Sequence, residues 1–339
     1  LSVDTTGTGI SASYLNGVLT LAGTDSAANY QEVIRTATYN NTSQDPDPAD
    51  RIIEFVVNSG TLSSDVATTT VSVTPINDAP IAISGDFLGN VFEDSSSPDL
   101  TAIGTVQFTD PDLHDTHNVI VTFDSTTHTS QLGNLTAVVT IPSAGTGSGE
   151  VTWTYSVPNS AVQFLAAGET ITETYLGSFD DGSVVTTPVP VVITITGSND
   201  VPSISADNSV VVTDEGSIAT NTGGFGDVDG DSVSLTASIG NVFDNGDGTW
   251  SWSHTESDDF VQTVTITADD GTDQRTTQFD LVVNNVAPTV ILDPVVTIDE
   301  NGLATLTGTI IDPGTFDTFT MDIDWGDPAS PNNIEQRVF

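Results

Sequence analysis

The sequence predicts an all-β protein made of tandem β-sandwiches, and three observations lead to this prediction. Apolar and polar residues alternate with a period of two along most of the chain, and helical periodicity is nearly absent. The alternating segments are rich in Thr, Val and Ile, which favour strands. The same order of short motifs also returns at intervals of roughly 80–120 residues, a length typical of repeated β-sandwich modules.

The expected elements can be placed in order along the chain. Asn16-Gly17, within an alternating run at 13–21, is suited to the type I′ turn of a hairpin. Helical turns are compatible only with the stretches at 29–39 and 159–169. Half-buried strands are predicted at 51–57, 67–73, 149–157, 190–197, 263–271 and 277–283.

Acidic residues dominate the charge of the chain. Its 339 residues include 47 Asp and Glu against four Arg and no Lys, which gives a formal net charge of -43. No basic surface can form, so we expect no nucleic-acid partner and no binding to anionic membranes. Of the acidic residues 37 are Asp, which favours turns and is a common ligand of hard cations. Two explanations remain open: many Asp turns on an acidic surface, or Asp clusters that bind Ca²⁺.

The chain contains no cysteine, so disulfides and thiolate metal sites play no part in it. No apolar run approaches the roughly 18 residues of a membrane-spanning helix, and we expect no membrane insertion. Neither end of the sequence has the pattern of a domain boundary. We therefore expect the chain to be a window of a longer polypeptide.

Three related boundary motifs end runs of alternating residues: PINDAP at 75–80, GSNDVP at 197–202 and VNNVAP at 283–288. Each is followed by an acidic pair, a strand that ends in Asp and a strand that contains Trp. This order predicts Ig-like or cadherin-like Greek-key β-sandwiches arranged end to end. The predicted modules are 1–79, 80–201, 202–287 and 288–339, of which the first and last are incomplete.

These segments resemble repeat families of bacterial extracellular proteins. Residues 80–201 resemble a VCBS-type repeat, in GTVQFTDPDLHDTHNVIV, VTWTYSVPNSAVQFLAAGETITETYLGSFDDG and VVITITGSNDVP. Residues 1–79 resemble a bacterial cadherin-like repeat, in LAGTDSAANYQEVIRTATYNNTS, DRIIEFVV and VTPINDAP. Residues 202–339 resemble PKD-like and Ig-like repeats, in NGDGTWSW, LVVNNVAPTV and IDWGD. The resemblance implies a region of a very large secreted or surface-attached bacterial protein, commonly an adhesin.

The boundary motifs resemble cadherin linkers, and this resemblance implies where Ca²⁺ would bind. In the cadherin arrangement the linker supplies Asn and Asp, and the following domain supplies a D-x-D loop and a later Asp. Together these groups can offer the six to eight oxygen ligands that Ca²⁺ takes. The first site would comprise Asn77, Asp78, Asp110 and Asp112 with Asp180 or Asp181. The second would comprise Asn199, Asp200, Asp227, Asp229 and Asp231 with Asp269 or Asp270.

Glu93 and Glu215 are additional candidate ligands at the ends of their own modules. The third boundary departs from the pattern, because NNVAP has no Asp and DPGTFD replaces D-x-D. At most a weaker site is expected there.

We find no motif for catalysis, neither G-x-S-x-G, nor a phosphate-binding loop, nor H-E-x-x-H, and we expect no enzyme activity. His114 and His117 could ligate a metal, but a solvated loop is the favoured interpretation. Trp250 and Trp252 lie on one face of their strand, where core packing is favoured over sugar binding. Trp153 and Trp325 are interpreted as core residues for the same reason.

The sequence thus predicts a Ca²⁺-stiffened stalk that extends a bacterial surface protein for adhesion. Its expected partners are calcium and further copies of related domains in the same chain. Two alternatives remain open, a self-assembling extracellular fibre or sheath subunit and a module that binds a glycan or protein receptor.

Overall fold

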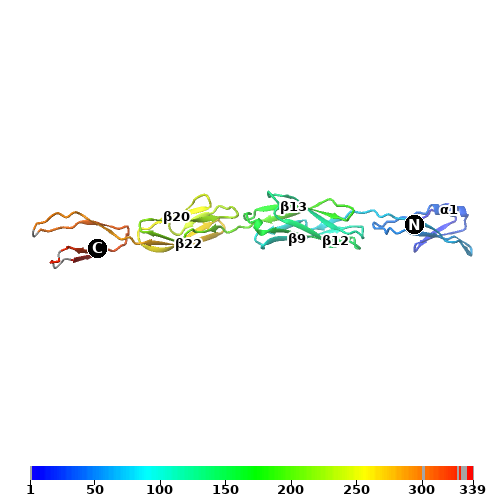
Figure 1. Ribbon diagram of the computed structural model, residues 1–339. Coiled ribbons are helices and arrows are strands. Elements are labelled where there is room, and N and C mark those ends of the chain that lie inside the picture. Colours follow the sequence, from blue (N-terminus) through cyan, green and yellow to red (C-terminus); the bar gives the residue numbers. More distant parts are fainter. Residues whose placement is uncertain (1, 300–301, 327, 330–333, 339) are drawn as a thin grey trace. The chain divides into compact units, whose positions relative to one another are not determined.

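The computed structural model describes residues 2–299, 302–326, 328–329 and 334–338, and it confirms the all-β class (Figure 1). By internal contacts the chain divides into two units, and the division passes through residues of the predicted second module. The first unit comprises Leu1–Gly89, Thr101–Ser156 and Thr172–Ile193. The second comprises Asn90–Leu100, Val157–Ile171 and Thr194–Phe339.

Residues before 80 form small two-stranded sheets and one helix. The predicted hairpin is present, because Leu15 pairs with Val18 and the φ values of Asn16 (49°) and Gly17 (82°) fit a type I′ turn. The helix begins after Ser26, whose hydroxyl accepts the N–H of Asn29. Strand β3 pairs with β6 and β4 with β5. The elements are β1 (Ser11–Leu15), β2 (Val18–Ala22), α1 (Ala27–Arg35), β3 (Arg51–Phe55), β4 (Asn58–Ser59), β5 (Leu62–Ser63) and β6 (Ala67–Val71).

Two four-stranded sheets follow, with the strand orders β11-β12-β9-β7 and β10-β13-β14-β8. Alternate residues of β12 are buried, as the period of two predicts. Trp153 from the first sheet and Tyr175 and Val191 from the second line one apolar interior. The strands are β7 (Ile81–Gly85), β8 (Leu88–Phe92), β9 (Asp99–Thr109), β10 (Asn118–Thr126), β11 (Asn134–Ile141), β12 (Ser148–Pro158), β13 (Thr170–Asp180) and β14 (Val189–Thr196).

The second unit holds a further pair of four-stranded sheets, with the orders β15-β17-β20-β19 and β16-β22-β21-β18. Trp250 and Trp252 from the first of these sheets pack against Phe279 and Leu281 from the second. Strand β20 pairs with β17 in one sheet and β22 pairs with β21 in the other; β20 and β22 are labelled in Figure 1. The strands are β15 (Ser203–Ile204), β16 (Val210–Asp214), β17 (Ile218–Gly226), β18 (Ser234–Ala237), β19 (Asn241–Asp244), β20 (Thr249–Thr255), β21 (Phe260–Asp269) and β22 (Gln274–Asn284).

The described residues after 288 form only two-stranded sheets. Strand β23 (Thr289–Leu292) pairs with β24 (Gly308–Ile311), and β25 (Thr320–Asp324) pairs with β26 (Ile334–Val338). Trp325 directly follows β25 and is 45% exposed. The prediction that Trp325 packs in a core is therefore wrong, because no second sheet covers this hairpin in the described part of the chain.

The other three tryptophans lie in the cores, as predicted. Trp153, Trp250 and Trp252 are at most 2% exposed. Each indole N–H is satisfied by a backbone carbonyl: Trp153 donates to Asp86 (2.7 Å), Trp250 to Ser205 (3.1 Å) and Trp252 to Ile239 (2.7 Å). Rings buried in this way cannot stack on a sugar, so the sugar-binding alternative for Trp250 and Trp252 is wrong.

A glycine makes room for one tryptophan in each sandwich. A Cβ on Gly104 would lie 2.3 Å from the Trp153 ring, and a Cβ on Gly223 would lie 2.6 Å from the Trp250 ring. A Cβ on Gly223 would also lie 2.0 Å from the carbonyl oxygen of Ser205, which accepts the Trp250 N–H. The two sandwiches thus use the same device to place a large ring between their sheets.

This device can be tested by adding a methyl group. We expect Gly223→Ala to destabilise the second sandwich by about 1–3 kcal/mol, because the backbone and the indole would both have to shift. Gly224→Ala is the matched control, since a Cβ there meets no atom closer than 3.7 Å. Urea unfolding followed by Trp fluorescence would measure both variants. Equal midpoints for the two would show that Gly223 is not needed for the packing of Trp250.

Candidate metal centres

The first boundary motif places its Asn and Asp against acidic residues from two loops of the first unit. The N–H of Asp78 donates to Asp112 Oδ2 (2.6 Å), and Asn77 Nδ2 donates to Asp181 Oδ2 (3.1 Å). The N–H of Asp112 in turn donates to Asp110 Oδ1 (2.8 Å), which makes the D-x-D segment a tight turn. We call this group the linker-1 site. It comprises Asn77, Asp78, Asp110, Asp112, Asp115 and Asp181.

The second boundary motif repeats these contacts within the second unit. The N–H of Asp200 donates to Asp229 Oδ2 (2.8 Å), and Asn199 Nδ2 donates to Asp270 Oδ2 (3.2 Å). The N–H of Asp229 donates to Asp227 Oδ1 (2.9 Å). We call this group the linker-2 site. It comprises Glu93, Asn199, Asp200, Asp227, Asp229, Asp231 and Asp270.

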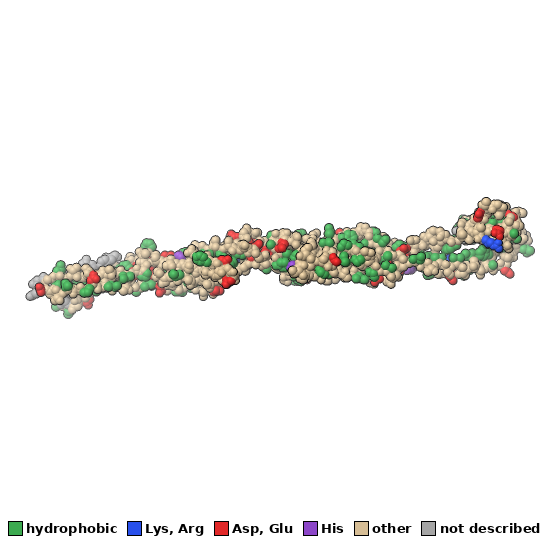
Figure 2. Space-filling model, turned by 90° about the horizontal axis from the view of Figure 1, so that it is seen from above, with side chains coloured by type: hydrophobic (Ala, Val, Ile, Leu, Met, Phe, Trp, Pro, Cys, Tyr) green, Lys and Arg blue, Asp and Glu red, His purple; other side chains and the backbone are tan. Residues whose placement is uncertain are grey.

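Within each site, carboxylate oxygens gather closely. In the linker-1 site, oxygens of Asp110, Asp115 and Asp181 lie within 4.8 Å of one another. The linker-2 site has two such groups that share Asp229, one with Glu93 and Asp200 and the other with Asp227 and Asp231. No ion pair in the described part of the chain joins an Arg to either site. Basic side chains are sparse on the face in Figure 2.

Several of these oxygens are buried without a hydrogen-bond partner. They are Asp115 Oδ2 in the linker-1 site, and Asp200 Oδ2, Asp227 Oδ2 and Asp229 Oδ1 in the linker-2 site. A buried carboxylate oxygen with no partner is costly, and a bound cation would remove that cost. The clustered atoms are carboxylate oxygens, which Ca²⁺ takes as ligands. The residues of both sites therefore fit a hard divalent cation.

The pKa values of the linker-2 carboxyls reflect this crowding. Burial raises the pKa of Glu93, Asp200 and Asp229, and neighbouring carboxylates add to each shift. In the linker-1 site, burial and the charges of Asp112 and Asp110 raise the pKa of Asp115. The pKa of Asp181 is lowered despite burial, because the N–H of Val184 and the Asn77 amide donate to its carboxylate.

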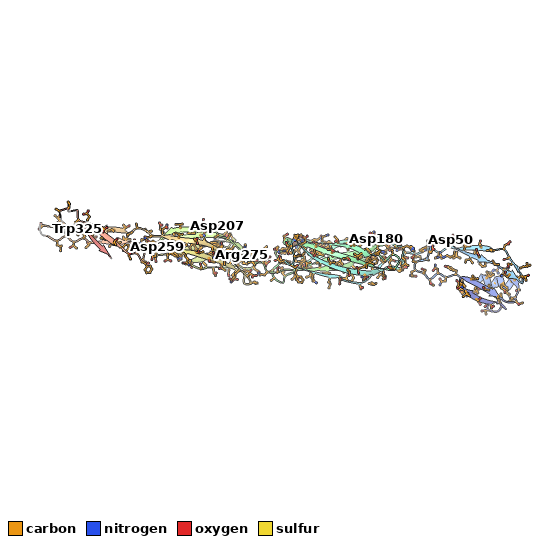
Figure 3. The ribbon with its side chains drawn as sticks, turned by 90° about the horizontal axis from the view of Figure 1, so that it is seen from below. Asp50, Asp180, Asp207, Asp259, Arg275 and Trp325 are labelled. Atoms are coloured by element: carbon orange, nitrogen blue, oxygen red, sulfur yellow. The ribbon has the colours of Figure 1, made fainter. Side chains whose placement is uncertain are left out.

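The structure distinguishes the two members of each double-Asp turn. Asp181 Oδ1 accepts the N–H groups of Ser183 and Val184, and its other oxygen faces Asn77. Asp180, the last residue of β13, accepts the N–H of Gly182 instead and contacts none of the linker-1 residues through a described hydrogen bond (Figure 3). Adjacent residues at a strand end point to opposite faces, which separates the two carboxylates.

The second double-Asp turn shows the same division. Asp270 Oδ1 accepts the N–H groups of Thr272 and Asp273 while its Oδ2 faces Asn199. Asp269 accepts the N–H of Gly271 and the amide of Gln274, so it caps the turn. Asp273 also accepts from Asn199 Nδ2 (3.1 Å), a contact that the sequence analysis missed.

The two glutamates each reach the boundary that follows their own module. Glu93 accepts the N–H of Ser198 (3.0 Å) and the side-chain amide of Gln163 (2.7 Å), which places it in the linker-2 site. Glu215 accepts the N–H of Val286 (2.8 Å), beside the third boundary motif.

Sequence reasoning missed the role of His117. It is buried, not solvated: its side chain is 1% exposed, and Nε2 lies 2.7 Å from Asp110 Oδ2. The other ring nitrogen lies 3.1 Å from Ser143 Oγ. Asp110 Oδ2 thus has a partner, whereas the equivalent oxygen of the linker-2 site, Asp227 Oδ2, has none. His114, by contrast, is exposed and pairs with Asp45 (2.9 Å), so the solvated-loop interpretation holds for it alone.

Comparison with known proteins gives no family assignment. No family model matches the chain, and no curated protein matches it. Among solved structures, titin domains Z1Z2 in complex with telethonin are similar at 13% identity over 62% of this chain and 98% of that one (TM-score 0.29). Cadherin-like domains 1 to 4 of zebrafish RET match at 11% identity over 74% and 60% (TM-score 0.27).

An endo-fucoidan hydrolase of glycoside hydrolase family 107 matches at 15% identity over 84% of this chain (TM-score 0.23), and the chain spans only 38% of that enzyme.

No helix among the described residues is long and apolar enough to span a membrane.

The charge balance of the linker-2 site can be tested with an isosteric substitution. An acid whose pKa is raised by folding contributes stability below its unfolded pKa of about 4 and loses it as pH rises through the folded value. In EDTA at pH 7 we therefore expect Asp229→Asn to be more stable than the wild type, on the order of 1 kcal/mol, since it relieves repulsion. The difference should shrink as pH falls towards 4, when the wild-type carboxyls are protonated.

Thermal unfolding at several pH values would measure this difference, with the exposed Asp207→Asn as the control. A wild type more stable than Asp229→Asn at pH 7 in EDTA would contradict the repulsion argument.

Proposed function

We propose that this chain is a non-catalytic, extracellular repeat region of a large bacterial surface or secreted protein, and that its linker-1 and linker-2 sites bind Ca²⁺. The proposal includes the module boundaries 1–79, 80–201, 202–287 and 288–339 and their resemblance to cadherin-like, VCBS-type and PKD-like repeats. The observation that carries it is the repeated contact set at two boundary motifs, which leaves buried carboxylate oxygens unpaired.

Each site draws its oxygens from segments far apart in the sequence. The linker-1 site combines the boundary motif at 77–78, the loop at 110–115 and the turn at 181. A cation that binds these segments only when they are together stabilises their arrangement by RT ln(1 + [L]/Kd). With the Kd of about 10⁻⁴–10⁻³ M typical of extracellular modules, millimolar Ca²⁺ would contribute on the order of 1 kcal/mol per site. The joint between successive modules would thereby become stiffer.

The two sites differ in the number of carboxylate groups and of unpaired carboxylate oxygens that they contain. The linker-2 site has two overlapping carboxylate groups and unpaired oxygens on Asp200, Asp227 and Asp229. In the linker-1 site His117 pairs with Asp110, and Asp115 carries the unpaired oxygen among the described residues. We therefore expect the linker-2 site to bind Ca²⁺ more tightly, or to bind a second ion.

A stalk role suits this chemistry better than catalysis. Backbone N–H groups orient carboxylates of both sites, and Trp153, Trp250 and Trp252 are buried in the cores. The net charge of -43 without any Lys suits an exposed, soluble repeat that gains from divalent cations outside the cell. Stiff modules in series would hold a distal adhesive domain away from the cell surface.

The proposal can be tested by small-angle scattering and thermal unfolding in EDTA, Ca²⁺ and Mg²⁺ at matched ionic strength. We expect Ca²⁺ to raise the melting temperature and to lengthen and stiffen the particle, and Mg²⁺ to do so less, because Mg²⁺ demands stricter octahedral geometry. Asp112→Asn and Asp229→Asn should each remove part of the response. Asp207→Asn, which alters an exposed Asp outside both sites, should keep all of it.

Identical scattering profiles and melting curves in EDTA and Ca²⁺ would remove the cation from the proposal. Concentration-dependent filaments in the same scattering samples would favour a self-assembling fibre or sheath subunit instead.

A further inference from the structure

A third acidic group surrounds Glu215, at the boundary where the sequence pattern predicted at most a weak site. Glu215 is 2% exposed, although Glu is almost never fully buried unless it is paired. Its Oε1 accepts the N–H of Val286, while its Oε2 is buried and has no hydrogen-bond partner. An unpaired oxygen on so deeply buried a carboxylate indicates that a ligand completes this position.

The loop at 312–317 brings further carboxylates to Glu215. Asp312 Oδ1 accepts the N–H of Gly314 (2.8 Å), the same i to i+2 turn that Asp110 and Asp227 form in the linker sites. Asp312 Oδ2 is buried and unpaired, like Glu215 Oε2. Burial, together with the charges of Asp312 and Glu215, raises the pKa of Asp317.

A backbone hydrogen bond holds this loop against the turn between β20 and β21. The N–H of Thr315 donates to the carbonyl of Ser257 (3.1 Å), and the hydroxyls of the two residues lie 3.3 Å apart. The next residues in that turn are Asp258 and Asp259, the second of which is labelled in Figure 3. The acids therefore come from three segments of the second unit, and backbone hydrogen bonds join the turn at 256–257 to both of the others, from Thr315 to Ser257 and from Gly216 to Glu256.

Two carboxylate groups share Glu215, and in each of them the oxygens lie within 4.8 Å of one another. One contains Asp312 and Asp317, and the other contains Asp258 and Asp259. The linker-2 site has the same design, with Asp229 as the shared residue. We call the residues at the third boundary the Glu215 cluster. It comprises Glu215, Asp258, Asp259, Asp312 and Asp317.

We infer that the Glu215 cluster is a third site for a hard divalent cation, of the Ca²⁺ class, with Glu215, Asp312 and Asp317 as its principal ligands. Asp258 and Asp259 supply outer carboxylates, and Asp259 is exposed to solvent. The site goes beyond the function proposed above, because it uses no Asn-Asp motif and none of the linker-1 or linker-2 residues. Among the described residues no ion pair joins an Arg to these five carboxylates, so a bound cation would balance their negative charge.

Calcium titration calorimetry of the 339-residue chain, after removal of metals with EDTA, tests this inference. Four variants would be compared with the wild type: Glu215→Gln, Asp317→Asn, Asp229→Asn and Glu256→Gln. Glu256 is the matched control, since it lies in the same turn as Asp258 but outside the cluster. We expect Glu215→Gln and Asp317→Asn each to remove one bound Ca²⁺ or to weaken it at least tenfold. Glu256→Gln should retain the wild-type isotherm.

The variants separate this site from the linker sites. If Asp229→Asn reduces binding while Glu215→Gln and Asp317→Asn do not, the third site is overturned and the linker-2 site stands. If only Glu215→Gln and Asp317→Asn reduce binding, the Glu215 cluster stands and the linker-2 site fails.

Hydrogen exchange provides a readout that does not depend on the folding of Glu215→Gln. In the wild type we expect Ca²⁺ to slow amide exchange across 312–317, and in Asp317→Asn we expect this protection to be lost. Equal exchange with and without Ca²⁺ in the folded wild type would overturn the inference.

Discussion

The linker sites depend on one contact, the backbone N–H of the boundary Asp donated to the second Asp of a D-x-D turn. This bond joins Asp78 to Asp112 and Asp200 to Asp229. It uses one oxygen of the D-x-D carboxylate and fixes the direction of the other. In the linker-2 site that other oxygen is left buried and unpaired. The acids are therefore held together by neutral backbone donors, which orient the carboxylates without cancelling their charge.

The sandwich cores and the boundary sites differ in whether their buried polar groups have partners within the protein. The cores are satisfied internally, since each buried Trp has a carbonyl partner and Trp153 and Trp250 each face a glycine. A buried acid in the middle sandwich is satisfied as well: Glu173 accepts from Tyr155 and Tyr175 (2.9 Å each). At the three boundaries, by contrast, some carboxylate oxygens are buried without a partner; they belong to Asp115, Asp200, Asp227, Asp229, Glu215 and Asp312. Within the described residues, the buried carboxylate oxygens without a partner are thus found at the boundaries and not in the sandwich cores.

Much of the fold and part of the candidate sites could be predicted from short-range patterns. Alternation at 149–157 and 277–283 places the core strands, and Asn16-Gly17 places a turn, because both depend on neighbouring residues. The partners of Asp115 and of Glu215 could not be predicted, although Glu215 itself was a candidate ligand. Their partners lie far away in the sequence: Asp181 is 66 residues from Asp115, and Asp312 is 97 residues from Glu215.

The sequence by itself determined the all-β class, the boundary motifs and the excess of acid, because strand periodicity, turn residues and charge are local or summed properties. The tertiary structure alone decided which acids meet. It selected Asp181 over Asp180 and Asp270 over Asp269, since only one side chain of each pair faces the boundary. It also paired His117 with Asp110 and buried Glu215 among distant carboxylates. Burial and the loss of water partners arise only when separate loops come together, and no linear spacing encodes them.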